Sequence, residues 1–238
     1  MELVAWMAGE SHTDHPQSVA TVIAAFSRCF NDALDSAQRQ RLGLLTARMI
    51  GTYGTRELDL ARSQMLWNWM IATVVPEWLA GAERRDLADL VFADRAASLD
   101  TATRALDVYG HAPVRPVDDR RTSASVSSAL AAAGVIGACV AGKDAADGVI
   151  GSRARRRWES AYALTRAAAW SVAERSEARL SQTANALRDS AFSVLEALIE
   201  AGTPPAPPPP PPAPLAAENG SISSIWSAVS PRDYAGER

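Results

Sequence analysis

Nine prolines between Pro204 and Pro214 divide this chain of 238 residues into a part that can fold and a part that cannot. Proline fixes its own φ angle and has no N–H to donate, so such a run enters neither a helix interior nor a central strand. It favours extended polyproline II, which buries no apolar surface. We therefore predict a globular domain over 1–202, a polyproline spacer over 203–214 and a disordered proline-rich C-terminal tail ending in 215–238.

Before the prolines, apolar side chains recur at spacings of three and four residues, which is the period of an α-helix. The stripe is clearest after residue 17, where five apolar residues share one helix face: Val19, Val22, Ile23, Phe26 and Phe30. Alternation of apolar and polar residues, the pattern of a strand, never persists. The sequence predicts an all-α fold, a multi-helix bundle of about seven or eight helices.

Capping residues and helix breakers predict where these helices begin and end. Gly9 closes a first short helix, and the helix that starts near residue 17 continues towards residue 34. An Asp35–Gln38 pair then fits a capping box that opens a third helix. Pro76 lies inside the helical pattern of 56–80, so we expect a kink or a break just before it.

The tryptophans are large apolar side chains that each carry one polar N–H group. Because they lie at helical spacing, we expect most of them to line the core with the indole N–H near its edge. The residues concerned are Trp6, Trp67, Trp69, Trp78, Trp158 and Trp170.

One uncharged stretch, 122–142, could imitate a membrane span. It is rich in Ala, Gly and Ser and poor in Leu, Ile and Phe, so its apolar content is marginal for insertion and a tightly packed core helix is expected.

At the N-terminus, Glu2 and the lack of a basic run argue against a secretory signal. Cys29 and Cys139 lie in apolar runs as free thiols. We expect a cytoplasmic protein without a membrane partner.

The formal net charge of −3 gives no general attraction to phosphate backbones. A local basic cluster nevertheless stands beside Trp158, which could stack on a base while the guanidinium groups grip phosphates. The cluster consists of Arg153, Arg155, Arg156 and Arg157. The alternative is a solvated helix face, or pairing with nearby acids such as Asp144, Asp147 or Glu159, and we expect this rather than a nucleic-acid site.

Two imidazoles and a carboxylate lie within four residues at His12, Asp14 and His15, and these groups suit zinc or iron. Pro16 makes the segment a turn, so further ligands would have to come from elsewhere in the chain. A metal-dependent hydrolase centred on this cluster is one hypothesis. The alternative is that Asp14 or Ser18 caps the following helix while the histidines lie at the surface.

The tail beyond the spacer is too short and too polar to form a core, yet it carries spaced apolar residues: Ile222, Ile225, Trp226, Val229 and Tyr234. The first four would share one helix face, and Trp and Tyr are efficient anchors in partner pockets. A stiff spacer would hold this group away from the domain. Docking on a protein partner is the leading interpretation, and folding back onto the domain is the alternative.

Two segments carry a resemblance. The Gly9-Glu-Ser-His-Thr-Asp-His-Pro16 segment and the 180–201 segment, which contains Ser190-Ala-Phe192, resemble the opening and the closing helix of a family of helical proteins from high-GC, actinobacterial-type bacteria. The resemblance implies a helical fold and transfers no catalytic residue, because no reaction is established for the family. The proline-rich tail departs from its common pattern.

Taken together, the residues favour a non-catalytic helical scaffold or adaptor whose tail docks on a protein. We find no convincing set of acid, base and nucleophile, and we expect no cofactor. The metal-dependent hydrolase and the nucleic-acid-binding protein are the competing hypotheses, and the sequence does not specify an oligomeric state.

Overall fold

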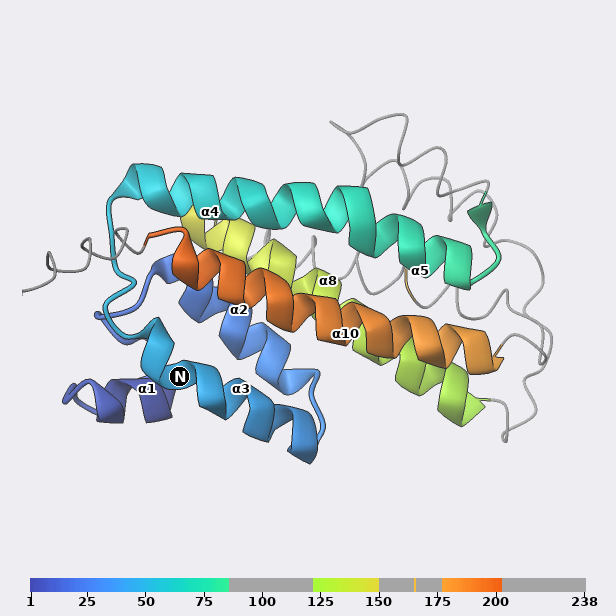
Figure 1. Ribbon diagram of the computed structural model, residues 1–238, viewed down its shortest axis with the longest axis horizontal. Helices are drawn as coiled ribbons and strands as arrows, with labels where there is room; N and C mark the ends of the chain where they lie inside the picture. The colour runs from blue at the N-terminus through green and yellow to red at the C-terminus, as the bar shows by residue number, and fades with distance from the viewer. Residues whose placement is uncertain (86–121, 150–164, 166–176, 203–238) are drawn as a thin grey trace, which may run out of the picture. The chain divides into compact units, whose positions relative to one another are not determined.

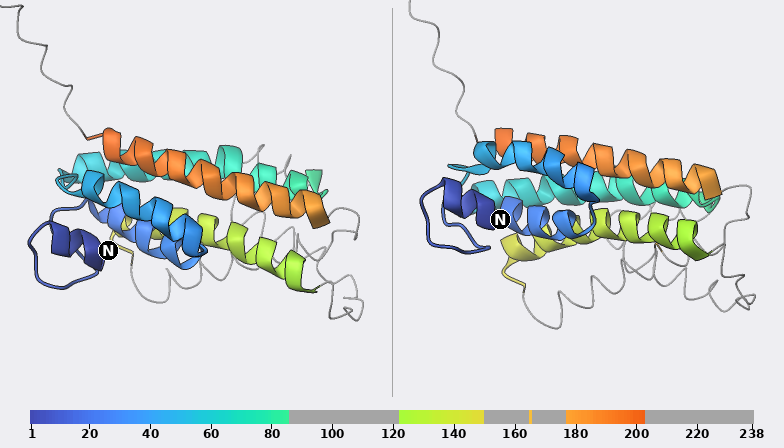
Figure 2. Two further views of the ribbon diagram at one scale, coloured as in Figure 1. Left: turned by 60° about the horizontal axis from the view of Figure 1, so that its bottom comes forward. Right: turned by 90° about the horizontal axis from the view of Figure 1, so that it is seen from below.

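The computed structural model describes residues 1–85, 122–149, 165 and 177–202. Every regular element in these ranges is helical, which confirms the predicted all-α bundle (Figures 1 and 2). The elements are α1 (Glu2–Met7), α2 (Thr21–Asp32), α3 (Ser36–Met49), α4 (Arg56–Trp69), the π-helical turn η1 (Met70–Val74), α5 (Val75–Gly81), α8 (Thr122–Asp147) and α10 (Glu177–Glu200).

Two of the predicted helical stretches lie partly outside the described residues. These are most of the pattern at 82–109 and the first half of the pattern at 153–201. The described residues all belong to one compact unit, Met1–Thr203. The predicted spacer and tail at 203–238 lie beyond them and stay predictions.

The start of α3 is set by the predicted capping box. The Gln38 N–H donates to Asp35 Oδ1 at 2.9 Å, and the Asp35 N–H donates to Gln38 Oε1 at 3.3 Å. Two N–H groups without intrahelical partners are thereby satisfied.

The start of α2 differs from the prediction, because the helix begins at Thr21 and not near residue 17. The N–H groups of Gln17 and Ser18 donate instead to the carboxylate of Glu10, which holds this segment in a turn. Val19 is buried all the same, so the apolar spacing indicated burial correctly while misplacing the helix boundary.

The predicted disturbance near Pro76 takes the form of a π-helical turn. In a regular helix the proline ring would collide with the carbonyl of the residue four positions earlier. Here the Val75 N–H bonds to the Met70 carbonyl, five residues back, and the wider turn realigns the carbonyls ahead of the proline. α4 therefore continues through η1 into α5 (Figure 1).

α8 is the central helix of the described bundle and packs against α2, α4 and α10. Gly134 lies directly against Ala33, and Gly142 lies against Leu66 and Val22. Small residues let helix backbones approach closely, and this is the packing that the Ala- and Gly-rich sequence predicts.

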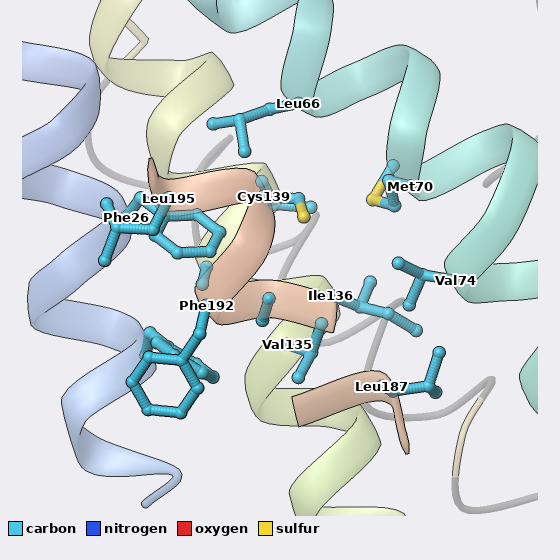
Figure 3. Packing of buried hydrophobic residues seen from close by; sticks show 14 of the residues in the cluster. Phe26, Leu66, Met70, Val74, Val135, Ile136, Cys139, Leu187, Phe192 and Leu195 are labelled. Atoms are coloured by element: carbon cyan, nitrogen blue, oxygen red, sulfur yellow. The ribbon is translucent and has the colours of Figure 1, made fainter. Parts of the chain in front are cut away.

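The core lies where side chains from α2, α4, α8 and α10 converge (Figure 3). Phe30 stands between two other rings, with its centroid 5.5 Å from that of Phe26 and 5.1 Å from that of Phe192. The Phe30–Phe192 pair is edge-to-face, a favoured arrangement for aromatic rings.

Among the described residues, one helical stretch, Ser127–Asp147, is long and apolar enough to cross a membrane. Two thirds of its apolar window is buried inside the protein, at 67%. Because α8 packs against three other helices, this burial fits the core helix that the sequence predicts.

Most of the described tryptophans lie at the core, as predicted, and one does not. Trp78 is fully buried, and Trp67 and Trp69 pack against the core, with the Trp69 indole N–H donating to Ser190 Oγ at 3.2 Å. Trp6, however, is 74% exposed. Trp158 and Trp170 lie outside the described residues.

Candidate functional site

Three of the exposed large apolar side chains in the described part of the chain belong to the short helix α1. Leu3 is 51% exposed, Trp6 74% and Met7 43%. Residues three and four apart share one side of a helix, so these three side chains form a single surface, here called the α1 face. Val4 and Ala5 on the opposite side are buried in the bundle.

Two side-chain contacts and a glycine turn fix the position of α1. The Thr46 hydroxyl of α3 donates to the Gly43 carbonyl at 2.6 Å and lies 3.6 Å from Met7 Sδ, and Glu2 pairs with His12 at 3.3 Å. Gly9 ends the helix with a φ of +72°, a left-handed conformation that glycine adopts without a steric penalty. α1 therefore lies against the bundle, beside α3 (Figure 2).

Glu10 anchors the loop that follows α1. Its Oε2 accepts from the Gln17 N–H at 2.7 Å and its Oε1 accepts from the Ser18 N–H at 2.8 Å. The Ser18 side chain and these N–H groups lower the pKa of the Glu10 carboxyl. The Ser18 carbonyl accepts in turn from the N–H groups of Gly51 and Tyr53, which ties the loop to the end of α3.

The predicted metal ligands lie in this loop but are engaged in separate pairs. His15 Nδ1 lies against Asp14 Oδ1, and this contact lowers the pKa of the Asp14 carboxyl. His12 instead pairs with Glu2. Within residues 1–85, 122–149 and 177–202, no three His, Cys, Asp or Glu side chains are grouped to hold a metal ion. The metal-dependent hydrolase thus stays a prediction from sequence.

Asp14 also fixes the loop through its backbone, because Arg28 Nη1 of α2 donates to the Asp14 carbonyl at 2.6 Å. The predicted role of Asp14 or Ser18 as the cap of α2 is not what the structure has, since Ala20 is the N-cap residue and no side chain caps it. The histidines are exposed, as that alternative expects.

Burial makes both cysteines poor nucleophiles. It raises the pKa of the Cys29 thiol to about 11, and it also raises the pKa of the Cys139 thiol well above its ordinary value. The thiolate, which is the reactive form, is scarce near neutral pH at such values. This agrees with the expectation that Cys29 packs in the bundle.

The other predicted site residues lie outside the described part of the chain. They are the basic cluster Arg153, Arg155, Arg156 and Arg157, and the tail residues Ile222, Ile225, Trp226, Val229 and Tyr234. One acid considered as a partner for the arginines is already paired, since Lys143 Nζ lies 2.7 Å from Asp147 Oδ1.

The sequence interpretation missed the α1 face because it placed Trp6 in the core. A helix of six residues can bury only one side, and Val4 and Ala5 occupy that side. The signal was present: residues 3 to 7 are all apolar, so a helix there must leave some of them in solvent.

Compared with known proteins, the chain matches no protein-family model, no curated protein and no solved structure. The resemblance of residues 9–16 and 180–201 to a family of helical bacterial proteins stays an expectation from sequence.

Proposed function

We propose that this protein is a helical scaffold or adaptor that binds a protein partner through apolar anchors outside its core. The observation that supports this most is Trp6, which is 74% exposed on a helix that is itself fixed to the bundle. Tryptophan is enriched among the residues that dominate binding energy at protein interfaces.

The α1 face suits recognition of an apolar protein surface. Leu3, Trp6 and Met7 combine a rigid aromatic ring with flexible aliphatic side chains, a mixture that adapts to a partner pocket. Since α1 is held against α3 and buries Val4 and Ala5, a partner would find the face already ordered. Preorganisation of this kind lowers the entropic cost of association.

The tail is the second proposed anchor, on the ground of its sequence. Ile222, Ile225, Trp226 and Val229 are spaced for one helix face, and Tyr234 follows them. Short apolar helices of this type commonly bind in grooves of other proteins. The proline spacer before them can extend by about 3.1 Å per residue, which gives the group a long reach.

We place the protein in the cytoplasm. Burial of α8, the helix within the described ranges that is both long and apolar enough to cross a membrane, supports this location, and so do the free thiols of Cys29 and Cys139. Unpaired cysteines persist in a reducing compartment.

The experiment is affinity capture from cells of the intact chain and of three variants. Trp6→Ser and removal of residues 203–238 should each lose partners that the intact chain retains. Leu44→Ser is the matched control, because Leu44 on α3 is 79% exposed but belongs to neither anchor, and it should retain all partners. Circular dichroism should show that each variant is helical.

Identical partner sets for the intact chain, Trp6→Ser and the shortened chain would contradict the proposal. Loss of the same partners from Leu44→Ser would also contradict it, because binding would then follow general surface hydrophobicity. A partner lost from only one of the two test variants would assign that partner to one anchor.

A further inference from the structure

Arg62 of α4 is a charged side chain without exposed surface. It occupies a position between Leu58 and Leu66 on the same side of the helix, where the spacing predicts an apolar residue. Burying a charge is costly unless its hydrogen bonds are satisfied inside the protein. The partners of this guanidinium group therefore indicate what the arginine does.

Arg62 joins two segments that are far apart in the sequence. Its Nε donates to the Leu198 carbonyl at 3.0 Å, and its Nη1 donates to the Thr52 carbonyl at 2.9 Å. Leu198 lies in the last turn of α10, where the final carbonyls have no partner within the helix. Thr52 lies in the loop between α3 and α4.

A third segment joins through Asp59, one turn before Arg62. Asp59 Oδ1 lies 3.5 Å from Arg62 Nη1, and Asp59 Oδ2 accepts from the Thr21 hydroxyl at 2.6 Å. Thr21 is the first residue of α2. The arginine thus connects the end of α10 with the start of α2 and with the loop after α3.

Gly202, just after α10, completes the arrangement. A Cβ atom at this position would overlap Arg62 Nη2 and would lie 2.9 Å from Leu58 Cδ2. The overlapped atom, Nη2, has no hydrogen-bond partner among the described residues, but Nε and Nη1 of the same group are each held by a buried hydrogen bond. A side chain at position 202 would therefore press on the guanidinium group and disturb those two bonds.

We propose that Arg62 holds the last turn of α10 in place through its bonds to the Leu198 and Thr52 carbonyls, and we call this arrangement the latch. It fixes the point from which the chain continues beyond Gly202. Without the latch this turn opens locally while the rest of the bundle stays folded. The inference concerns the domain itself and holds whether or not the tail binds a partner.

Hydrogen exchange of the intact chain, read by mass spectrometry, tests the latch in the variant Arg62→Met. Loss of hydrogen bonds from a charged donor should accelerate exchange at residues 196–202 by about tenfold or more. Exchange at residues 180–192 should be unchanged.

The matched control is Arg48→Met, which removes only exposed ion pairs to Glu196 and Glu200 at the same end of α10. It should leave exchange there unchanged.

Gly202→Ala is the second variant, because it disturbs the latch without removing a buried charge. It should accelerate exchange in the same residues, 196–202. Equal acceleration across α2, α8 and α10 in either variant would overturn the proposal, since Arg62 would then support the whole bundle. Unchanged exchange in Gly202→Ala would also overturn it, even if Arg62→Met fails to fold.

Discussion

Two helix pairs in this bundle are joined by opposite means. α8 approaches α2 so closely at Gly134 that an added Cβ would overlap the Ala33 side chain and lie 3.3 Å from its Cα. α3 and α10 instead face each other through long charged side chains. Arg41 Nη1 lies 2.7 Å from Asp189 Oδ1, and Arg48 Nη2 lies 3.0 Å from Glu200 Oε1.

The difference lies in how far each contact can adapt. Backbones in close contact cannot accommodate added volume, because protein interiors are packed as densely as organic crystals. An exposed arginine can choose other rotamers and other partners, and water competes for its hydrogen bonds. The α2–α8 contact should therefore be sensitive to single atoms, whereas the α3–α10 contact should tolerate substitution.

The largest effect is expected for Gly134→Leu in α8. The side chain must enter space occupied by Ala33, so the helices have to separate and the free energy of unfolding should fall by about 3 kcal/mol or more. Urea denaturation measures the change. The matched control is Gly43→Ala in α3, where nothing lies within 4 Å of an added Cβ. It should stabilise the protein by about 0.5–1 kcal/mol, because alanine favours the helix. Destabilisation of similar size by both variants would remove the contrast.

A smaller effect is expected for Arg41→Met in α3. The variant loses the exposed pair with Asp189 and the position of the guanidinium group 4.1 Å above the centre of the Phe192 ring. Together these contacts should contribute about 1 kcal/mol to the free energy of unfolding. A double-mutant cycle with Asp189→Asn isolates the ion pair, and its coupling energy should shrink in high salt. A salt-independent coupling of several kcal/mol would place this contact in the same class as the α2–α8 interface.

The smallest effect is expected for Glu10→Gln, and it should depend on pH. The Ser18 side chain and the N–H groups of Gln17 and Ser18 lower the pKa of Glu10 in the folded protein. The ionised carboxylate therefore stabilises the fold above its ordinary pKa of about 4.3, and this contribution is lost as the pH falls through the lower folded value. Urea denaturation should show a deficit for the variant at neutral pH that disappears in acid. A deficit that stays constant with pH would show that the charge of Glu10 is not involved.

The sequence by itself determined the class of the fold and several of its boundaries. These features depend on local chemistry: the Asp35–Gln38 capping box joins residues three apart, and Pro76 disturbs its own helix wherever that helix lies. The small residues of α8 likewise indicate a close helix contact before the partner helix is known. Spacing also indicated that Val22 and Phe26 are buried, because one face of an amphipathic helix turns inward in any bundle.

Only the tertiary structure decided which long-range partners these elements have. Glu10 reaches forward to Gln17 and Ser18, so α2 begins later than its apolar stripe indicates. Arg62 lies inside the bundle because the carbonyls of residues 52 and 198 both accept hydrogen bonds from its side chain. No pattern of neighbouring residues in the sequence predicts these two partners. Trp6 stays in solvent because Val4 and Ala5 occupy the one side of α1 that the bundle can cover. Propensity and spacing act between near neighbours in the chain, whereas burial of a particular side chain depends on what the rest of the protein places against it.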